Sequence, residues 1–555
     1  MDRRTIVAIL LILGVVLITP RFFPAAPRPT PPPVALGDSS LRSLAAPAPP
    51  PPAAVAASPS RTLGVVELVP AQQPARVAET ILIDDAASRL TLSITGASIA
   101  SILLPGYQAL DKSGRSVSLT SGDQGPLVSF RLLTGRDTIA LSTIPFVATR
   151  SGNAVTFAGQ VGTRSIGITY DVVKDSFLTR VSGTIHDATT PSAPAFLLVD
   201  LPVTLESFEA DSSADHTALS YAAKPLQKRA EGIPFGSLDP GERQIVTGPI
   251  SWAVAKNKYF MLGLLARTGD SSFAEVIAVG GDRTSRTATR AHGTVVNKLP
   301  ADGAFAFELY AGPQQYKRLQ ALGRDFENSN PYGGWMQAFV QPFATMVMKV
   351  LLWMKATLGL SYGWLLVLFG VAVRIILWPL NQSAMRATTK MQRIQPELSA
   401  IQTKFKGDPP RLQSEMMRVY KDHNMSPFSA FAGCLPLLIP MPVLFALFFV
   451  FQNTIEFRGV PFLWLADISL KDPFYIVPLL MGATMFVLSW VGMRNSPPNP
   501  QAKMMAYIMP VMMTVLFGNF ASGLNLYYAV QNIAAIPQQW LISNERGRAA
   551  DKAKA

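Results

Sequence analysis

The stretch GVAVRIILWPL, residues 370–380, places one arginine inside an otherwise apolar run. No other charged residue occurs between Leu358 and Leu380. A guanidinium is always protonated, so Arg374 could attract a carboxylate inside a hydrated cavity. Alternatively, its long side chain could extend to the membrane surface, which at 1.5 Å per residue lies about 10 Å away near Asn381. The position of the arginine leaves both interpretations open.

The apolar residues around Arg374 are numerous enough to carry it into a membrane. An arginine at the centre of a spanning helix costs about 2.5–3.5 kcal/mol. The same run contains 13 Leu, Ile, Val or Phe residues. At roughly −0.3 to −0.6 kcal/mol each, they contribute about −4 to −8 kcal/mol. We therefore expect this run to insert into a membrane, and a charge retained there suggests a function.

The last apolar run, residues 523–542, is polar for a membrane span. It contains five side-chain amides: Asn525, Gln531, Asn532, Gln538 and Gln539. Amides that face lipid lose their hydrogen bonds, so these residues favour a polar cavity inside the helix bundle. Methionine is also concentrated here, with 18 of the 20 methionines after residue 330. Methionine suits surfaces that bind varied apolar partners, although it also fills ordinary cores.

The overall charge of +13 and the pI of 9.7 could indicate a nucleic-acid partner. The basic residues of the C-terminal half, however, cluster between the apolar runs, which is the pattern of cytoplasmic loops in a membrane protein. We therefore expect a lipid bilayer and no DNA as partners. The single cysteine, Cys434, and four scattered histidines offer no metal-ligand spacing. No catalytic motif is present, so we expect no enzyme activity and no cofactor.

Five candidate spans follow residue 358: about 360–380, 433–453, 474–492, 504–520 and 523–542. The basic residues favour a cytoplasmic location for the loop 381–430, the turn 493–503 and the C-terminus. At the N-terminus, Arg3 and Arg4 precede about 15 apolar residues, which is typical of a cleavable signal peptide or of an uncleaved anchor. We favour the anchor, which gives six spans with both ends of the chain in the cytoplasm.

Between the anchor and the later spans, the sequence changes character twice. Residues 24–60 are rich in proline and predict a semi-stiff tether. From about residue 62 to 325, short alternating runs bounded by Gly, Pro, Asp and Ser predict strands, for example at 89–104, 176–187 and 303–312. Many short strands in such a region predict an all-β sandwich. Helical periodicity first occurs at 313–329.

The loop 381–430 has its own helical pattern. Apolar residues recur at spacings of three and four on both sides of a central break, which predicts two helices packed on one another. These residues are Met391, Ile394, Leu398, Ile401 and Phe405, then Leu412, Met416, Val419 and His423. At the break, Asp408 is placed to cap the second helix and Pro409 to begin it. We predict a helical hairpin.

Several sequence blocks in this order resemble the YidC membrane protein insertases. The blocks are RIILWPL, MQRIQPEL, GCLPLLIPMPVLFAL, DPFYIVPLLMGATMF and SGLNLYYAVQN, within residues 331–545. The N-terminal half resembles the Gram-negative form of that family. The resemblance implies a polytopic α-helical membrane protein, with a five-helix insertase core and an N-terminal anchor, that also carries an all-β sandwich periplasmic domain.

The implied domain boundaries follow the composition. They are an N-terminal anchor at 1–23, a Pro-rich periplasmic linker at 24–61, a periplasmic β-sandwich at 62–330, an interfacial amphipathic helix at 331–357, a five-helix core at 358–545 that includes the hairpin 381–430, and a short basic tail at 546–555. The implied location is the bacterial inner membrane.

The implied function is the insertion and folding of inner-membrane proteins, alone or with the Sec translocon, through a hydrophilic groove open to the cytoplasm and to lipid. Nascent membrane proteins and Sec components are the expected partners, with weak ribosome contact because the tail is short. The implied substrate-binding residues are Arg374, Gly370, Met441, Trp464, Tyr527, Tyr528 and Asn532. One departure is Pro440, where family members commonly have glutamine.

Two other functions remain possible on the residues alone. A transporter or channel could use Arg374 as its substrate-binding charge, although no internal repeat is evident. A membrane-tethered sugar-binding protein could use the β-domain, although its isolated histidines offer no evident acid–base pair.

Overall fold

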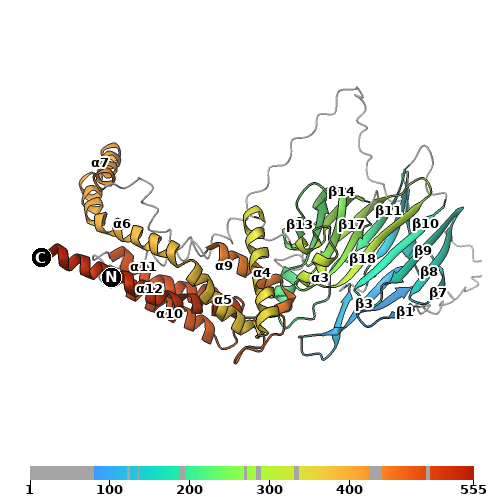
Figure 1. The fold of residues 1–555 in the computed structure, drawn as a ribbon. Helices are drawn as coiled ribbons and strands as arrows, with labels where there is room; N and C mark the ends of the chain where they lie inside the picture. Colours follow the sequence, from blue (N-terminus) through green and yellow to red (C-terminus); the bar gives the residue numbers. More distant parts are fainter. Residues whose placement is uncertain are drawn as a thin grey trace, which may run out of the picture. The chain divides into compact units, whose positions relative to one another are not determined.

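In the computed structural model, the described residues of the 555-residue chain are 80–121, 125–135, 137–186, 194–267, 272–282, 289–330, 337–423, 441–494 and 500–554. The predicted anchor at 1–23, the linker at 24–61, and Cys434 and Pro440 lie outside these residues. Along the described chain, strands occupy the part up to residue 313 and most helices follow residue 337 (Figure 1).

The first four strands form a small antiparallel sheet in the order β1-β2-β3-β4. They are β1 (Thr80–Asp84), β2 (Arg89–Ser93), β3 (Ser98–Gln108) and β4 (Ser116–Thr120). The predicted strand run 89–104 is therefore two strands, because a turn with positive φ at Gly96 and Ala97 separates them. Glycine adopts this backbone conformation without a steric penalty.

The other strands form one large antiparallel sheet, in the order β6-β5-β11-β17-β16-β14-β15-β18-β10-β9-β8-β7; off this path, β12 pairs with β14, and β13 pairs with β12. Its strands are β5 (Ser129–Thr134), β6 (Asp137–Ala140), β7 (Val147–Ser151), β8 (Ala154–Val161), β9 (Arg164–Val172), β10 (Leu178–Ile185), β11 (Ala195–Leu201), β12 (Ser220–Pro225), β13 (Glu231–Pro234), β14 (Arg243–Lys256), β15 (Phe260–Ala266), β16 (Phe273–Gly280), β17 (Ala291–Lys298) and β18 (Ala304–Pro313). The long strand β14 joins the two halves: its first part pairs with β16 and its second part with β15.

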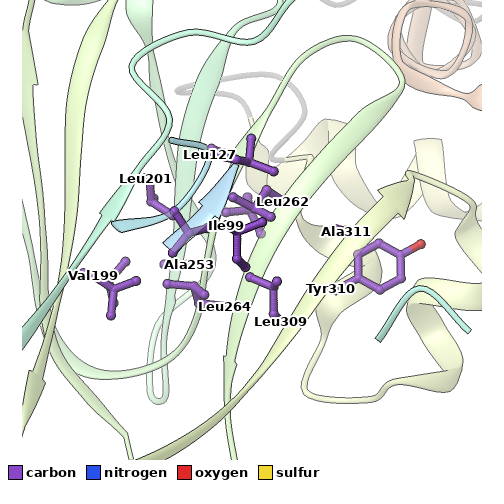
Figure 2. Close-up of a cluster of buried hydrophobic side chains, with 14 of the residues drawn as sticks. Ile99, Leu127, Val199, Leu201, Ala253, Leu262, Leu264, Leu309, Tyr310 and Ala311 are labelled. Carbon is purple, nitrogen blue, oxygen red and sulfur yellow. The ribbon is translucent and has the colours of Figure 1, made fainter. Parts of the chain in front are cut away.

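The sheets enclose one hydrophobic core, as predicted for a sandwich. Along β9, buried and partly exposed residues alternate, which is the period of a strand with one covered face. Every residue of β15 is buried, so this strand is covered on both faces. Figure 2 shows Ile99 of the small sheet among Val199, Leu264 and Leu309 of the large sheet. The predicted sandwich is confirmed.

Helices inside this domain are short. The periodic stretch 313–329 yields only α3 (Tyr316–Ala321) and a 3₁₀ turn (Phe326–Asn328), because β18 extends to Pro313 and a turn with positive φ at Gly323, Arg324 and Asp325 ends α3. A further helix, α2 (Ser212–Thr217), was not expected from the sequence. Asp211 caps it by accepting a hydrogen bond from the backbone N–H of Ala214.

The C-terminal part is helical. Its helices are α4 (Gln337–Leu358), α5 (Tyr362–Ile376), α6 (Trp378–Lys404), α7 (Pro409–Asp422), α9 (Met441–Asn453), α10 (Ile476–Met493), α11 (Pro500–Phe517) and α12 (Ser522–Lys554). Of the described helices, α10 alone is long and apolar enough to cross a membrane by itself. Helices α4 and α5 meet that criterion together but are bent by 117°. The predicted six spans stay a prediction.

Two helix boundaries differ from those expected. The predicted span 360–380 ends early, at Ile376, and α6 begins at Trp378 after Leu377, with Pro379 in its first turn. Proline at the start of a helix loses no intrahelical hydrogen bond, so a new helix can begin there. The predicted tail from residue 546 is not a separate segment, since α12 continues to Lys554.

The predicted hairpin is present as α6 and α7. Asp408 accepts a hydrogen bond from the N–H of Arg411, and Pro409 is the first residue of α7, so the predicted cap is confirmed. The buried contact between the helices consists of Ile394, Leu398, Val419 and Tyr420, with Ile401 and Met416 beside them. Tyr420 replaces the expected His423, whose ring instead contacts Glu397 at 3.0 Å on the exposed side.

Candidate functional site

Arg374 lies in the last turn of α5, and its guanidinium contacts α12. Its Nη2 donates to Oε1 of Gln538 at 2.7 Å. The amide of Gln538 in turn donates to the carbonyl of Trp378 at 2.9 Å, and its side chain is buried. The buried Nε of Arg374 has no acceptor among the described residues. The arginine therefore does not face away from the helices, and its direct partner carries no compensating charge.

Several amides of α12 hydrogen-bond to neighbouring helices, and the polar cavity expected from them stays a prediction. Gln531 donates to the carbonyl of Gly370 at 2.8 Å and to the hydroxyl of Tyr527 at 3.1 Å. Asn532 donates to the carbonyl of Met481 in α10 at 3.3 Å. Asn525 is fully buried and donates to the carbonyl of Phe517 at 3.0 Å. The amide N–H groups of these residues therefore donate inside the bundle, which avoids the cost of exposing them to lipid, although the buried Oδ1 of Asn525 has no donor among the described residues.

We refer to Arg374, Tyr527, Gln531, Asn532 and Gln538 as the arginine cluster. Its members come from α5 and α12 and reach α10 through Asn532. The three helices are otherwise held by apolar packing, in which Tyr527 lies beside Phe369 with ring centroids 5.9 Å apart. The cluster is thus a polar region between apolar helices, with one permanent positive charge.

Gly370 lies where α5 and α12 approach each other closely. A Cβ atom at this position would lie 3.1 Å from Cγ1 of Val530, which is tighter than an ordinary contact. The missing side chain also leaves the Gly370 carbonyl accessible to Gln531. Gly370 therefore helps to place the polar side chains of α12 against α5, which is a structural contribution to the cluster.

The other candidate residues take different positions. Tyr528 packs on Phe517 of α11, with ring centroids 5.3 Å apart. Met441 begins α9, but its side chain lies outside the described residues. Trp464 lies between α9 and α10, where its indole N–H contacts the carboxylate of Asp472 at 3.4 Å. Among the described residues, no hydrogen bond or ring contact joins Trp464 to the arginine cluster.

The β-domain contains a separate cleft of about 790 Å³ on strands β5, β11, β16 and β17. Two of its charged lining residues, Arg131 and Asp200, pair with each other. Arg131 makes two hydrogen bonds of 2.6 Å to Asp200 and one of 3.1 Å to Thr294. Within the described part of the chain, no group of three or more His, Cys, Asp or Glu residues is arranged to hold a metal ion.

The sequence matches two family profiles, one in each half. Residues 80–346 match the profile described as the YidC periplasmic domain, and residues 353–549 match the 60Kd inner membrane protein profile. The membrane protein insertase YidC of Paraburkholderia xenovorans (strain LB400) is 30% identical over 393 residues, which cover 69% of this chain and 68% of that protein. The chain belongs to the YidC family of membrane protein insertases.

A second YidC insertase, from Chlorobium limicola, is 28% identical over 508 residues, which cover 84% of this chain and 83% of the relative. The predicted family is thereby confirmed. YidC proteins belong to the inner membrane and carry a periplasmic domain, so the β-domain of this chain is periplasmic.

Two solved structures match parts of this chain at low TM-scores. The first is a crystal structure of an active YidC insertase with its first transmembrane domain resolved. The match covers 84% of this chain and 93% of that chain, with 17% identity and a TM-score of 0.34. The second is a galactose mutarotase-like protein from Lactobacillus casei ATCC 334. The match covers 42% of this chain and 100% of that chain, with 13% identity and a TM-score of 0.31. Both scores are below 0.5, so neither structure assigns a role to a residue.

Two features of the site were missed by reasoning from the sequence. Gln538 was noted as polar but not as the partner of Arg374, because the two residues are 164 positions apart. Another arginine, Arg458, follows α9 and pairs with Glu209 of the β-domain, 249 positions away. A single sequence can indicate such a pair only by a charged or polar residue among apolar neighbours. It does not show which distant residue is the partner.

Proposed function

We propose that this insertase transfers membrane proteins from the cytoplasm into the inner membrane, with Arg374 receiving acidic groups of the segment that must cross. The observation that supports this role is the pairing of Arg374. Its described hydrogen-bond partner is the neutral amide of Gln538, and its Nε has no acceptor among the described residues. A permanent cation of this kind can take a carboxylate without first breaking an ion pair.

The expected attraction is large enough to matter. Two unit charges 4 Å apart interact by about 4 kcal/mol at an effective dielectric constant near 20. The polar side chains of α12 would shorten the apolar distance that a polar segment of the substrate must cross. We propose that the cluster lines a hydrophilic groove open to the cytoplasm and to lipid, into which the substrate enters.

The driving force for insertion would come from the substrate. Each methylene group of its hydrophobic span gains roughly 0.8 kcal/mol when it leaves water for lipid. No bond is made or broken, so the proposal requires no cofactor, nucleotide or catalytic residue. We propose that the chain acts alone on small substrates and beside the Sec translocon on larger ones.

The topology is part of the proposal. We place both ends of the chain in the cytoplasm, so that α6 and α7 form a cytoplasmic hairpin that receives substrates. Helix α12 extends through the basic residues Arg546, Arg548, Lys552 and Lys554. We expect only weak contact of this extension with ribosomes.

The test is insertion of a single-span substrate into liposomes that contain only the purified chain, read by protease protection. Two versions of the substrate differ in carrying an acidic or a neutral translocated segment. We expect Arg374→Ala to slow insertion of the acidic version by about tenfold or more, since it removes a few kcal/mol of attraction. Arg374→Lys should retain most of the activity because it retains the charge.

A matched control is Ile375→Ala, one position away on the exposed side of α5, where the side chain is 64% exposed. This variant should insert both substrates as the unmodified chain does. Equal insertion of both substrates by Arg374→Ala and the unmodified chain would instead favour an arginine that only reaches the membrane surface. If the unmodified chain inserted the substrates no faster than empty liposomes do, the result would favour a protein that acts only beside a translocon, or a transporter.

A further inference from the structure

The segment that joins α9 to α10 carries an arginine, Arg458, whose side chain is buried. Arg458 follows a 3₁₀ turn (Ile455–Phe457), and we refer to residues 454–472 as the junction segment. The side chain of Arg458 is 7% exposed and that of its partner Glu209 is 5% exposed. This is the most buried ion pair among the described residues.

The guanidinium of Arg458 contacts three separate parts of the β-domain. Its Nε lies 2.8 and 3.0 Å from the two carboxylate oxygens of Glu209. Its Nη2 donates to the carbonyl of Gln108, at the end of β3, at 2.9 Å. Its plane lies over the ring of Phe260 in β15, 5.4 Å from the centroid. One side chain therefore links Glu209, the small sheet and the large sheet.

Two further hydrogen bonds join the same surfaces. The hydroxyl of Tyr259 donates to Oγ of Ser469 at 2.9 Å, and the N–H of Tyr316 donates to Oε1 of Glu456 at 3.3 Å. The apolar residues around Arg458 divide between the two domains. Ile455 is buried in the core of the β-domain, whereas Phe457 is buried in the core of the helices. The junction segment thus contributes to both cores.

The other side of the junction segment is tied to the helices. The carbonyl of Leu470 accepts from the N–H of Ser522, and the carbonyl of Ile468 accepts from the N–H of Gly523, at 2.7 and 2.9 Å. These are the first residues of α12, which carries most of the arginine cluster. At its end, the segment leads into α10, whose Met481 carbonyl accepts from Asn532.

We propose that Arg458 is a positioning residue of the insertase: it docks the β-domain on the junction segment and thereby holds α10 and α12 in place around the arginine cluster. Its effect on the site is indirect, through backbone hydrogen bonds to the start of α12. The docking follows from the contacts of Arg458 alone, whereas its effect on insertion rests on the proposed function.

The experiment measures hydrogen exchange and insertion with the full-length chain in liposomes. Arg458→Gln removes the charge and the forked geometry, and Arg458→Lys keeps the charge only. The control is Arg131→Gln, which breaks a more exposed arginine–carboxylate pair that lies entirely inside the β-domain. For Arg458→Gln we expect amide exchange on the order of 100-fold faster in the junction segment and in residues 206–216, because a buried ion pair is broken between them.

Three results together support the proposal. First, amide exchange in the paired strands β10 and β18 of Arg458→Gln stays as slow as in the unmodified chain. Second, Arg458→Lys accelerates exchange in the junction segment less than Arg458→Gln does. Third, insertion by Arg458→Lys is slower than by the unmodified chain and faster than by Arg458→Gln. A role in folding alone would accelerate exchange in β10 and β18 as well and would overturn the proposal. Unchanged exchange in the junction segment would overturn the docking, and faster exchange with unchanged insertion would overturn the positioning role.

Discussion

Arg374 and Arg458, two arginines of this insertase that contact buried partners, have opposite surroundings. Arg458, at the junction with the β-domain, faces a carboxylate, a backbone carbonyl and an aromatic ring. Arg374, between α5 and α12, contacts the neutral amide of Gln538, and its Nε has no acceptor among the described residues. A charge paired with a buried carboxylate contributes to holding a structure together. A charged side chain that still has a hydrogen-bond donor without an acceptor can bind an acidic group of a substrate.

The largest expected effect is a difference in the loss of folding stability when each of the two arginines is replaced by alanine. Arg458→Ala should destabilise the protein by about 3–5 kcal/mol, because it leaves the Glu209 carboxylate buried without its cation. Arg374→Ala should cost about 1–3 kcal/mol, since it leaves the buried amide oxygen of Gln538 without its donor but leaves no charge unpaired. Thermal unfolding in nanodiscs measures both. Equal losses of stability would mean that Arg374 is structural too.

The pH dependence of stability should also distinguish the two regions. Burial raises the pKa of Glu209 from 4.5 to about 7, an effect strengthened by Asp215 and opposed by Arg458 and Lys258. The folded protein then holds this proton more tightly than the unfolded chain. Stability from this group is therefore present below pH 4.5 and is lost as the pH rises through 7.

Burial raises the pKa of Asp215 as well, so this neighbour acts in the same direction as Glu209. Unfolding measured from pH 5 to 8 tests the prediction. Glu209→Gln should flatten most of the dependence, whereas Arg374→Ala should leave it unchanged because an arginine does not titrate in this range. A Glu209→Gln variant with the full pH dependence would contradict the assignment.

A smaller effect is expected for the amide that holds Arg374. Gln538→Leu removes the described partner of the guanidinium and the donor to the Trp378 carbonyl. We expect a loss of about 1–3 kcal/mol, the usual cost of leaving buried polar groups unsatisfied. Chemical denaturation in detergent measures this loss. Gln538→Glu offers Arg374 a carboxylate but no donor to Trp378, so it should restore only part of the stability lost in Gln538→Leu and should slow insertion of acidic substrates.

The smallest effects concern two hydroxyl groups. Tyr259→Phe removes the donor to Ser469 at the junction, and Tyr527→Phe removes the acceptor for Gln531 in the arginine cluster. Each substitution should cost about 1 kcal/mol by thermal unfolding. Only Tyr527→Phe should alter the ratio of acidic to neutral substrate inserted. If Tyr259→Phe altered this ratio equally, the division between a structural and a substrate-binding region would be wrong.

Local features of the structure could be predicted because their causes are local. The Asp408-Pro409 pair starts α7 because a carboxylate and a fixed φ suit the first turn of a helix, whatever surrounds them. The sandwich follows from the alternation of apolar residues along strands such as β9. The stretch 313–329 was less predictable, since strand pairing of β18 and a turn at Gly323 competed with its helical period.

The sequence by itself determined that Arg374 and the amides near residues 525–539 lie in apolar runs, where each needs a polar partner. Only the tertiary structure decided that Arg374 meets Gln538 and that Arg458 meets Glu209. The physical reason is range: caps and strand periods act over a few residues of chain. Partners separated by 164 and 249 positions are chosen by how whole helices and sheets pack.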